Sequence, residues 1–176
     1  MEPIINKTEN IYTGKVIQVD LEKFRTTNGI EIQREVIHHP GAVCMLALNK
    51  DQKIYLVEQF RAPMKKKLLE LPAGTLEPEE NPEETAIREL QEEIGMKPNN
   101  IALMGGFYVA PGYCDEFVHL FTCTDLEPSK LEGDVDEDIK VIKMSLSEAI
   151  QAIQQGIIVD AKTICGILMW SAQSSQ

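Results

Sequence analysis

The chain has 176 residues, of which 28 are acidic and 17 basic, and its net charge of -11 makes it a poor candidate for general binding to nucleic acids or anionic membranes. Hydrophobic residues make up 43% of the sequence, which is enough to build a buried core. The length favours one main domain with a small N-terminal appendage, and the charge does not exclude a small phosphorylated substrate, because bound cations can invert the local charge.

The first predicted elements form a small antiparallel sheet. Residues 11–37 alternate loosely between apolar and polar side chains, and Thr27-Asn28-Gly29 is typical of a hairpin turn, so residues 30–37 are predicted to be the returning strand. Residues 41–48 are almost continuously apolar and predict a buried strand. We therefore expect an N-terminal sheet in residues 1–40 and the main domain in residues 41–176.

The main domain contains predicted strands and helices. Further strands are predicted at residues 53–60, 68–71, 101–109, 116–124 and 139–144. Lys65-Lys66-Lys67 is predicted to be a solvated turn, and the polar, acidic residues 125–138 a mobile loop. One helix is expected to begin at Ser145 or Ser147, and a last helix to begin after Asp160 and continue to about residue 170.

A predicted helix between Asn81 and Gly95 carries the most informative residues. Asn81 can cap its first turn, and Gly95 can end it in a left-handed conformation. Glu89, Glu92 and Glu93 stand at offsets of 0, 3 and 4, which share one face of a helix. Carboxylates this close repel one another unless a cation lies among them, and an oxygen-only cluster suits a hard divalent ion such as Mg²⁺ or Mn²⁺.

The alternative interpretation is an acidic surface helix, which is common in an acidic chain. Apolar residues on the arc beside the carboxylates are expected to face the core, namely Ala86, Ile87, Leu90 and Ile94. Because the acidic face borders buried surface, we interpret it as a site and not as a solvated stripe. Arg88 is spaced to pair with Glu92 one turn later and to reach back to Glu80.

The segment from Gly74 to Met96 resembles the Nudix box, G-x5-E-x7-R-E-U-x-E-E-x-G-U, in which U is an apolar residue. The residues that match its fixed positions are Gly74, Glu80, Arg88, Glu89, Leu90, Glu92, Glu93, Gly95 and Met96. The resemblance implies an α/β fold, the Nudix α/β/α sandwich with a mixed sheet, and hydrolysis of a nucleoside diphosphate linked to another moiety. It also implies Mg²⁺ as the cofactor, for which Mn²⁺ can substitute.

The same resemblance implies roles for individual residues. Glu89 and Glu93 are implied metal ligands together with the main-chain oxygen of Ala73, and Glu92 is implied to be a further ligand or a water-binding group. Glu80 and Arg88 are implied to form a structural ion pair. Glu92 and Glu93 are also the implied catalytic residues of the box, so the resemblance places much of the catalytic apparatus on one helix.

The general base of the resembled subfamily comes from the loop before the last strand. We assign this role to Glu137, because Asp136-Glu137-Asp138-Ile139 matches the acidic run that precedes that strand in the family. The other loop acids that remain as alternatives are Glu132, Asp134, Asp136 and Asp138.

A second motif narrows the substrate. Residues 110–116 read Ala-Pro-Gly-Tyr-Cys-Asp-Glu and resemble the motif S-P-G-[FY]-x-D-E of ADP-ribose pyrophosphatases, with Ala110 in place of Ser. Taken alone, an ordinary Pro-Gly turn with two acids is the favoured explanation of this segment. Other matching stretches extend the resemblance, to the ADP-ribose pyrophosphatases of Gram-positive bacteria, over residues 11–170. It implies cleavage of ADP-ribose to AMP and ribose 5-phosphate, substrate contacts from Pro111 and Glu116, and a homodimer formed by exchange of the N-terminal sheet.

Two arginines are candidate substrate ligands. The planar guanidinium group can donate two hydrogen bonds to a phosphate. The resemblance implies that Arg34, Arg61 or both contact the diphosphate or the terminal ribose side. The alternative is that both are surface residues on strands. His38 and His39 are predicted to be loop residues and not ligands, because oxygen ligands already suit the expected metal. Phe107 and Tyr108 are the candidates for stacking on adenine, with core packing as the default for either.

Other function classes give different expectations. Another Nudix hydrolase would act on NADH, a sugar nucleotide or a dinucleoside polyphosphate, whereas a non-catalytic ADP-ribose-binding module should lack a box carboxylate, and none is missing. A scaffold domain would leave the complete box unexplained. The four cysteines form no C-x-x-C pair, which favours a reduced, cytoplasmic protein, and neither a signal peptide nor a membrane span is expected.

Overall fold

The computed structural model describes residues 4–133 and 138–174. The chain forms two compact units, which are described separately. The N-terminal unit consists of residues 1–41 together with 107–117, and the main unit consists of residues 42–106 and 118–176. The predicted general base Glu137 lies outside the described residues.

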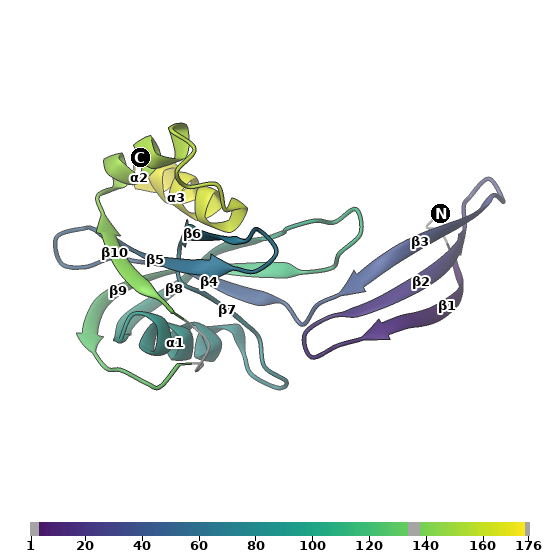
Figure 1. The fold of residues 1–176 in the computed structure, drawn as a ribbon, viewed down its shortest axis with the longest axis horizontal. Helices are drawn as coiled ribbons and strands as arrows, with labels where there is room; N and C mark the ends of the chain where they lie inside the picture. The colour runs from purple at the N-terminus through teal and green to yellow at the C-terminus, as the bar shows by residue number, and fades with distance from the viewer. Residues whose placement is uncertain (1–3, 134–137, 175–176) are drawn as a thin grey trace. The chain divides into compact units, whose positions relative to one another are not determined.

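The N-terminal unit contains a three-stranded antiparallel sheet in the order β1-β2-β3 (Figure 1). Its strands are β1 (Ile4–Thr13), β2 (Gln18–Arg25) and β3 (Glu31–His38). The turn before β3 forms where it was predicted, since Gly29 has a φ of 80° and its N–H donates to the carbonyl oxygen of Thr26. A side chain at that left-handed position would be strained, which explains the glycine.

A distant segment of the chain joins this sheet. Ile37 on β3 donates its N–H to the oxygen of Tyr113 at 2.7 Å and accepts from the N–H of Asp115 at 3.1 Å. The turn that contains Pro111 is therefore attached to the N-terminal sheet by backbone hydrogen bonds. No local pattern in the sequence indicated this attachment.

The main unit is built on two sheets. One has the order β7-β4-β9-β8 and the other β10-β5-β6. The strands are β4 (Ala42–Ala47), β5 (Ile54–Arg61), β6 (Lys66–Glu70), β7 (Ala73–Thr75), β8 (Met96–Tyr108), β9 (Phe117–Pro128) and β10 (Lys140–Met144). Because β4 runs parallel to β9 and antiparallel to β7, the sheet is mixed, as predicted.

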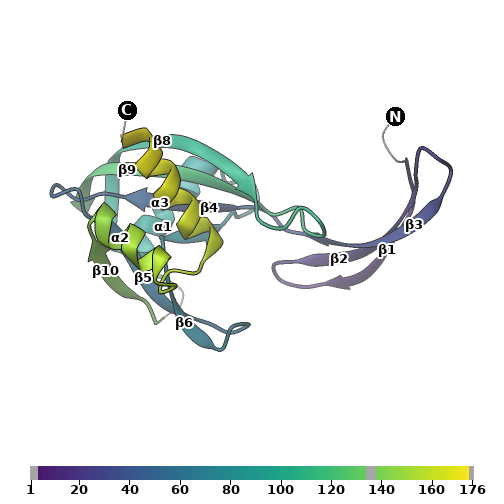
Figure 2. The same cartoon turned by 90° about the horizontal axis from the view of Figure 1, so that it is seen from above.

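Helices cover the strands of the main unit on opposite sides. They are α1 (Pro82–Glu93), α2 (Leu146–Gln154) and α3 (Ala161–Ser174). Figures 1 and 2 show α1 on one side of the strands and α2 with α3 on the other. This arrangement is the predicted α/β/α sandwich. In the described part of the chain, no helix has both the length and the apolar character that crossing a membrane would require.

The core explains why α1 docks as it does. Ala86 and Leu90 of α1 are fully buried against alternate residues of β4, Val43 and Met45, in one hydrophobic cluster. Residues of β4 are buried on both faces, which accounts for its continuous apolar sequence. The apolar arc of α1 faces the core as predicted, so the neighbouring acidic arc lies at the border of the buried surface.

The ends of α1 also match the sequence prediction. The side chain of Asn81 accepts a hydrogen bond from the N–H of Glu84 at 2.9 Å, which satisfies an amide in the first turn. Gly95, with a φ of 68°, follows the helix in the left-handed conformation that ends it. Capping thus fixes where the helix begins, and so fixes which strand residues lie opposite its carboxylates.

Several predictions were wrong in detail. Lys66 and Lys67 are not a turn but open β6, where they pair with Arg61 and Phe60 of β5. β9 continues to Pro128, so the first residues of the predicted loop at 125–138 form a strand. In both cases pairing with a neighbouring strand outweighs the polar character of the side chains. The default prediction that Tyr108 packs in the core is also wrong, because Tyr108 is 58% exposed.

Candidate active site

The carboxylates of α1 meet the backbone of β7. Glu93 is 7% exposed, and its Oε2 atom accepts the N–H of Ala73 at 3.1 Å. One turn earlier, the carboxyl group of Glu89 lies against Gly74, where an added Cβ would come within 2.0 Å of the Cδ atom of Glu89. Only a residue without a side chain permits this approach, which gives the first glycine of the box a structural reason.

Arg88 bonds three carboxylates. Its Nε and Nη2 atoms bond the two oxygens of Glu80, each at 3.0 Å. Its Nη1 atom bonds Glu89 at 2.9 Å and Glu92 at 3.0 Å. The hydrogen bond from Arg88 lowers the pKa of Glu80 below its ordinary value, and the same bond raises the pKa of Arg88. One guanidinium group therefore reduces the repulsion among these acids.

We expect Glu80→Gln to lower the free energy of unfolding by about 1–2 kcal/mol at pH 7, because one charged pair with Arg88 is lost. The pKa of Glu80 is lowered from 4.5 in the folded protein. Its contribution is therefore complete above 4.5 and is lost as the pH falls through the lower folded value. Urea unfolding at pH 7 and pH 4 measures this, with the exposed Glu127→Gln as control. A deficit that does not shrink at low pH would contradict the ion pair as its cause.

The residues around β7 fit a hard divalent cation by their chemistry. Within residues 4–133 and 138–174, no three His, Cys, Asp or Glu side chains are grouped as metal ligands. Arg88 bonds Glu89 and Glu92, whereas Glu93 accepts from Ala73. Glu89 and Glu93 nevertheless reach the same short backbone segment, so an all-oxygen donor set is present there. The metal roles of these residues and of the Ala73 oxygen stay predictions.

A polar cavity of about 320 Å³ adjoins the end of α1. Its lining includes Glu92, Glu93, Gly95 and Lys130, and it continues along Ile139. The two catalytic glutamates proposed on α1 thus face a space that can admit a small ligand. Of the alternative loop acids, Asp138 is exposed and pairs with Lys67 at 3.1 Å.

Arg61 lies in a charged cluster that sequence reasoning missed. Its Nε and Nη2 atoms donate to Glu70 at 2.8 and 2.7 Å, and Glu70 is only 1% exposed. Lys162 of α3 also bonds the Glu70 carboxylate. Burial would raise the pKa of Glu70, but hydrogen bonds and charges from Arg61 and Lys162 lower it overall. Both partners lie in stretches that carried the resemblance, where no role was assigned to them.

The remaining predicted substrate ligands belong to the N-terminal unit. Arg34 is exposed on β3, and together with Pro111 and Tyr108 it borders a mainly apolar cavity of about 410 Å³. The carbonyl oxygen of Glu116 accepts the N–H of Val109 at 3.3 Å, which closes the loop that carries Pro111. Arg34 and Pro111 therefore share one cavity, although 77 positions separate them in the sequence (111 − 34).

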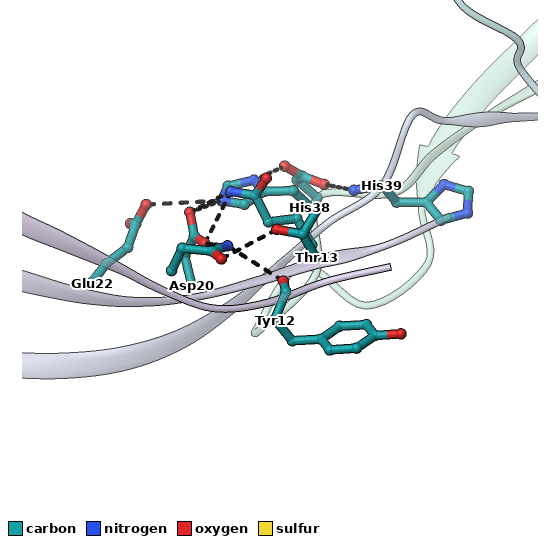
Figure 3. Close-up of polar contacts among 9 residues, drawn as sticks. Tyr12, Thr13, Asp20, Glu22, His38 and His39 are labelled. Atoms are coloured by element: carbon teal, nitrogen blue, oxygen red, sulfur yellow. Dashed lines mark hydrogen bonds and ion pairs between the residues drawn. The ribbon is translucent and has the colours of Figure 1, made fainter. Parts of the chain in front are cut away.

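A network of acids around His38 holds this loop (Figure 3). The Nδ1 atom of His38 lies 2.6 Å from Asp115, and the same carboxylate accepts the N–H of His39 at 2.8 Å. On its other side, Nε2 of His38 lies 3.5 Å from Asp20 and 4.0 Å from Glu22, both of β2. His38 is thus the last residue of β3 and not the predicted loop residue.

We expect the His38 imidazole to titrate above 6.5, because its hydrogen bond to Asp115 raises its pKa, with smaller contributions from the charges of Asp115, Asp20 and Glu22. Its stabilising contribution is complete below 6.5 and is lost as the pH rises through the folded pKa. An NMR titration of the histidine rings measures this, and Asp115→Asn should lower the value. His119 provides an internal reference, because burial lowers its pKa whereas the pKa of His38 is raised. An unchanged His38 titration in Asp115→Asn would refute the assignment.

Comparison with known proteins finds a family, relatives and a solved structure that are similar to this chain. The NUDIX domain model matches residues 38–165. An ADP-ribose pyrophosphatase of Bacillus subtilis (strain 168) is 40% identical over 161 residues, covering 90% of this chain and 87% of that protein. A methanol dehydrogenase activator of Bacillus methanolicus is 37% identical, covering 92% and 88%. A crystal structure of an ADP compounds hydrolase superposes with a TM-score of 0.88 at 21% identity, covering 98% of this chain and 94% of that one.

The fold and the box residues define a hydrolase of the Nudix class. The family match spans most of the sequence, and the chain belongs to the Nudix hydrolase family. Nudix hydrolases generally use divalent metal ions.

Proposed function

We propose that the protein hydrolyses ADP-ribose to AMP and ribose 5-phosphate. The observation that carries this proposal is the meeting of Glu89 and Glu93 with the Ala73–Gly74 backbone, within a chain 40% identical to an ADP-ribose pyrophosphatase. The Pro111 turn, which shares a cavity with Arg34, supports the substrate choice. In the reaction, water adds to one phosphorus atom and the P–O bond to the bridging oxygen breaks. The water's oxygen stays on the attacked phosphorus, the bridging oxygen leaves with the other phosphate, and the water's protons pass to the general base and to solvent.

We infer that Glu89, Glu93 and the main-chain oxygen of Ala73 hold Mg²⁺, with Glu92 as a further ligand or as the group that binds water, and that Mn²⁺ can substitute. A divalent ion bound there would neutralise the diphosphate charge and lower the pKa of the attacking water. The supporting observation is the close contact of Glu89 with Gly74, which a β-carbon would prevent. Arg88 is proposed to keep Glu89 and Glu92 in place through its ion pair with Glu80.

The other proposed roles follow from chemistry and position. Arg61 is proposed to bind the diphosphate, and Arg34, Pro111 and Glu116 are proposed substrate contacts. A carboxylate accepts the proton of the attacking water, and Glu137 is proposed for this step. Residues 41–176 then act as the hydrolase domain.

A homodimer formed through residues 1–40 is part of the proposal. The N-terminal unit exposes Ile11 and Tyr113, each by 58%, beside a mainly apolar cavity of about 480 Å³ that Val19, Leu21 and Ile37 also line. Apolar surface of this kind is better explained by a partner than by water, and a second copy is the partner that sheet exchange supplies. Light scattering at micromolar concentration tests the proposed homodimer.

The four cysteines are all free, which supports a reducing, cytoplasmic location.

Product analysis tests the catalytic proposal. ADP-ribose is incubated with the protein and excess Mg²⁺, alongside NADH, GDP-mannose and diadenosine polyphosphates, and AMP is identified by chromatography. Selective release of AMP from ADP-ribose is the expected result. Cleavage of another compound in its place would retain the box chemistry and reject the substrate. Binding of ADP-ribose without any cleavage would favour a binding module, although every box carboxylate is present.

A further inference from the structure

We propose that Lys162 is a positioning residue for diphosphate binding, which holds Glu70 so that Arg61 keeps a guanidinium N–H directed to a phosphate oxygen. This inference rests on the proposed role of Arg61 in the reaction. Lys162 comes from α3, 101 positions after Arg61 in the sequence (162 − 61), and its ammonium group bonds Glu70 and Asp160. It acts through the carboxylate that the two cations share.

The geometry of the cluster sets the orientation of Arg61. Glu70 accepts Nε of Arg61 on one oxygen and Nη2 on the other, so this carboxylate occupies one edge of the guanidinium plane. The Nη1 group lies on the opposite side of the guanidinium from that edge. Lys162 bonds the same Glu70 oxygen as Nη2 of Arg61 does. This second bond fixes the position of the carboxylate. The Arg61 side chain is 37% exposed and Glu70 only 1%, so the cluster is open at its arginine end.

Asp160 balances the charge of Lys162 and connects it to the box. Its Oδ1 atom lies 3.1 Å from Nζ of Lys162, and its Oδ2 atom accepts the N–H of Thr163 at 3.0 Å. The hydroxyl of Thr163 in turn accepts the N–H of Leu71 at 2.8 Å. Leu71 is followed by Pro72 and then by Ala73, whose N–H donates to Glu93. The start of α3 therefore supports both Glu70 and the backbone that meets the box glutamates.

Close packing keeps α3 at this distance. A Cβ added to Gly166 would lie 2.6 Å from a methyl group of Leu71, so the glycine lets the helix approach. Lys162, Thr163 and Gly166 lie within about one turn and face consecutive residues, Glu70 and Leu71. Because the helix cannot easily shift, the ammonium group of Lys162 is held at a fixed place against Glu70.

Lys162 also contributes a positive charge that keeps the cluster neutral. The cluster contains two cations, Arg61 and Lys162, and two acids, Glu70 and Asp160, so it is neutral when complete. Without Lys162 it would carry an excess negative charge next to the arginine that is proposed to receive a diphosphate. Within the described residues, Glu70 would then keep Arg61 as its one cationic partner and would compete directly with the phosphate. Both effects weaken substrate binding rather than the chemical step.

The test is a double-mutant cycle between Lys162 and Arg61. We expect Lys162→Met to raise KM for ADP-ribose about 10-fold while kcat changes by no more than about 2-fold. Lys162→Arg, which restores the charge, should recover most of the affinity. In an Arg61→Met background, Lys162→Met should change KM by less than about 2-fold, because the residue through which it acts is absent. An equal increase in both backgrounds would overturn the proposal, as would an unchanged KM in folded Lys162→Met.

Asp160→Asn changes the net charge of the cluster in the opposite direction from Lys162→Met. Asparagine can still accept the Thr163 N–H, so the helix cap is retained, but the cluster gains a positive charge. We expect KM to stay at the wild-type value or to fall. An increase like that of Lys162→Met would show that disruption, and not charge, raises KM, and would overturn the proposal. This variant also decides the question if Lys162→Met does not fold. The exposed Lys50→Met controls for loss of a lysine elsewhere.

Binding of a probe that cannot be hydrolysed separates this inference from the proposed function. Methylene diphosphonate carries the charge of a diphosphate, and calorimetry with Mg²⁺ present gives its Kd for each variant. We expect the same 10-fold weakening in Lys162→Met and the same non-additivity with Arg61→Met. If the wild type leaves ADP-ribose intact, the proposed substrate is wrong, yet this measurement still tests Lys162. Wild-type affinity in folded Lys162→Met would reject the positioning role.

Discussion

Glu93→Gln is expected to lower kcat by at least about 100-fold while the protein stays folded. The glutamine oxygen can still accept the N–H of Ala73, so the contact between α1 and β7 is retained. What is lost is the negative charge that the proposed divalent ion needs from a ligand. Steady-state kinetics with ADP-ribose and Mg²⁺, together with thermal unfolding of the same preparation, measures both parts of this prediction.

Glu84→Gln is the matched control for that variant. Glu84 is exposed in the first turn of the same helix, so its replacement makes the same change in charge without touching β7. We expect its kcat to equal that of the wild type. Calorimetric titration with Mn²⁺ should show weaker binding in Glu93→Gln alone. Wild-type turnover in Glu93→Gln would mean that Glu93 does not hold the metal.

Gly74→Ala is expected to disturb the site more than the fold. The new Cβ would come within 2.0 Å of the Cδ atom of Glu89, so one of the two must move. The carboxyl end of Glu89 is flexible and can shift at low cost, which limits the loss of unfolding free energy to about 1–3 kcal/mol. The displaced carboxylate no longer lies beside the Ala73–Gly74 backbone, and we expect kcat to fall by about 10- to 100-fold.

A second glycine calibrates this result. Gly156 has no atoms within 4 Å of an added Cβ, but its φ of 69° is left-handed. Gly156→Ala should therefore cost about 1–2 kcal/mol of stability through backbone strain and leave kcat unchanged. Urea unfolding and kinetics on both variants separate the two effects. If Gly74→Ala kept full activity, the close contact with Glu89 would not matter for catalysis.

Local interactions explain the parts of the fold that were predicted correctly. The cap of α1 joins Asn81 to Glu84, three residues apart, and the helix ends at Glu93, two residues before Gly95. The turn before β3 forms between Thr26 and Ile30. In such cases the partners are near neighbours in the chain, so residue type and spacing are sufficient. The ion pair between Glu80 and Arg88 also spans only 8 positions.

Errors arose where strand pairing decided the structure. Lys66 and Lys67 look like a solvated turn by composition, but they complete a ladder with β5. His38 ends a strand because β3 pairs with β2 along its whole length, including Gln18 with His38. A strand edge accepts polar residues whenever its backbone bonds are satisfied, so side-chain character alone is a weak guide there.

Residue types and spacings of a few residues were sufficient to predict the family-defining helix, its caps, the order of elements and the set of box carboxylates. The packed fold was needed to reveal that Lys162, 92 positions after Glu70, shares that carboxylate with Arg61, and that Asp115 accepts the N–H of His39, 76 positions earlier. Such contacts depend on how sheets and helices pack, and packing is fixed by the burial of apolar faces over the whole unit. The sequence therefore contains the residues that position the proposed site, but it does not show which residues they contact.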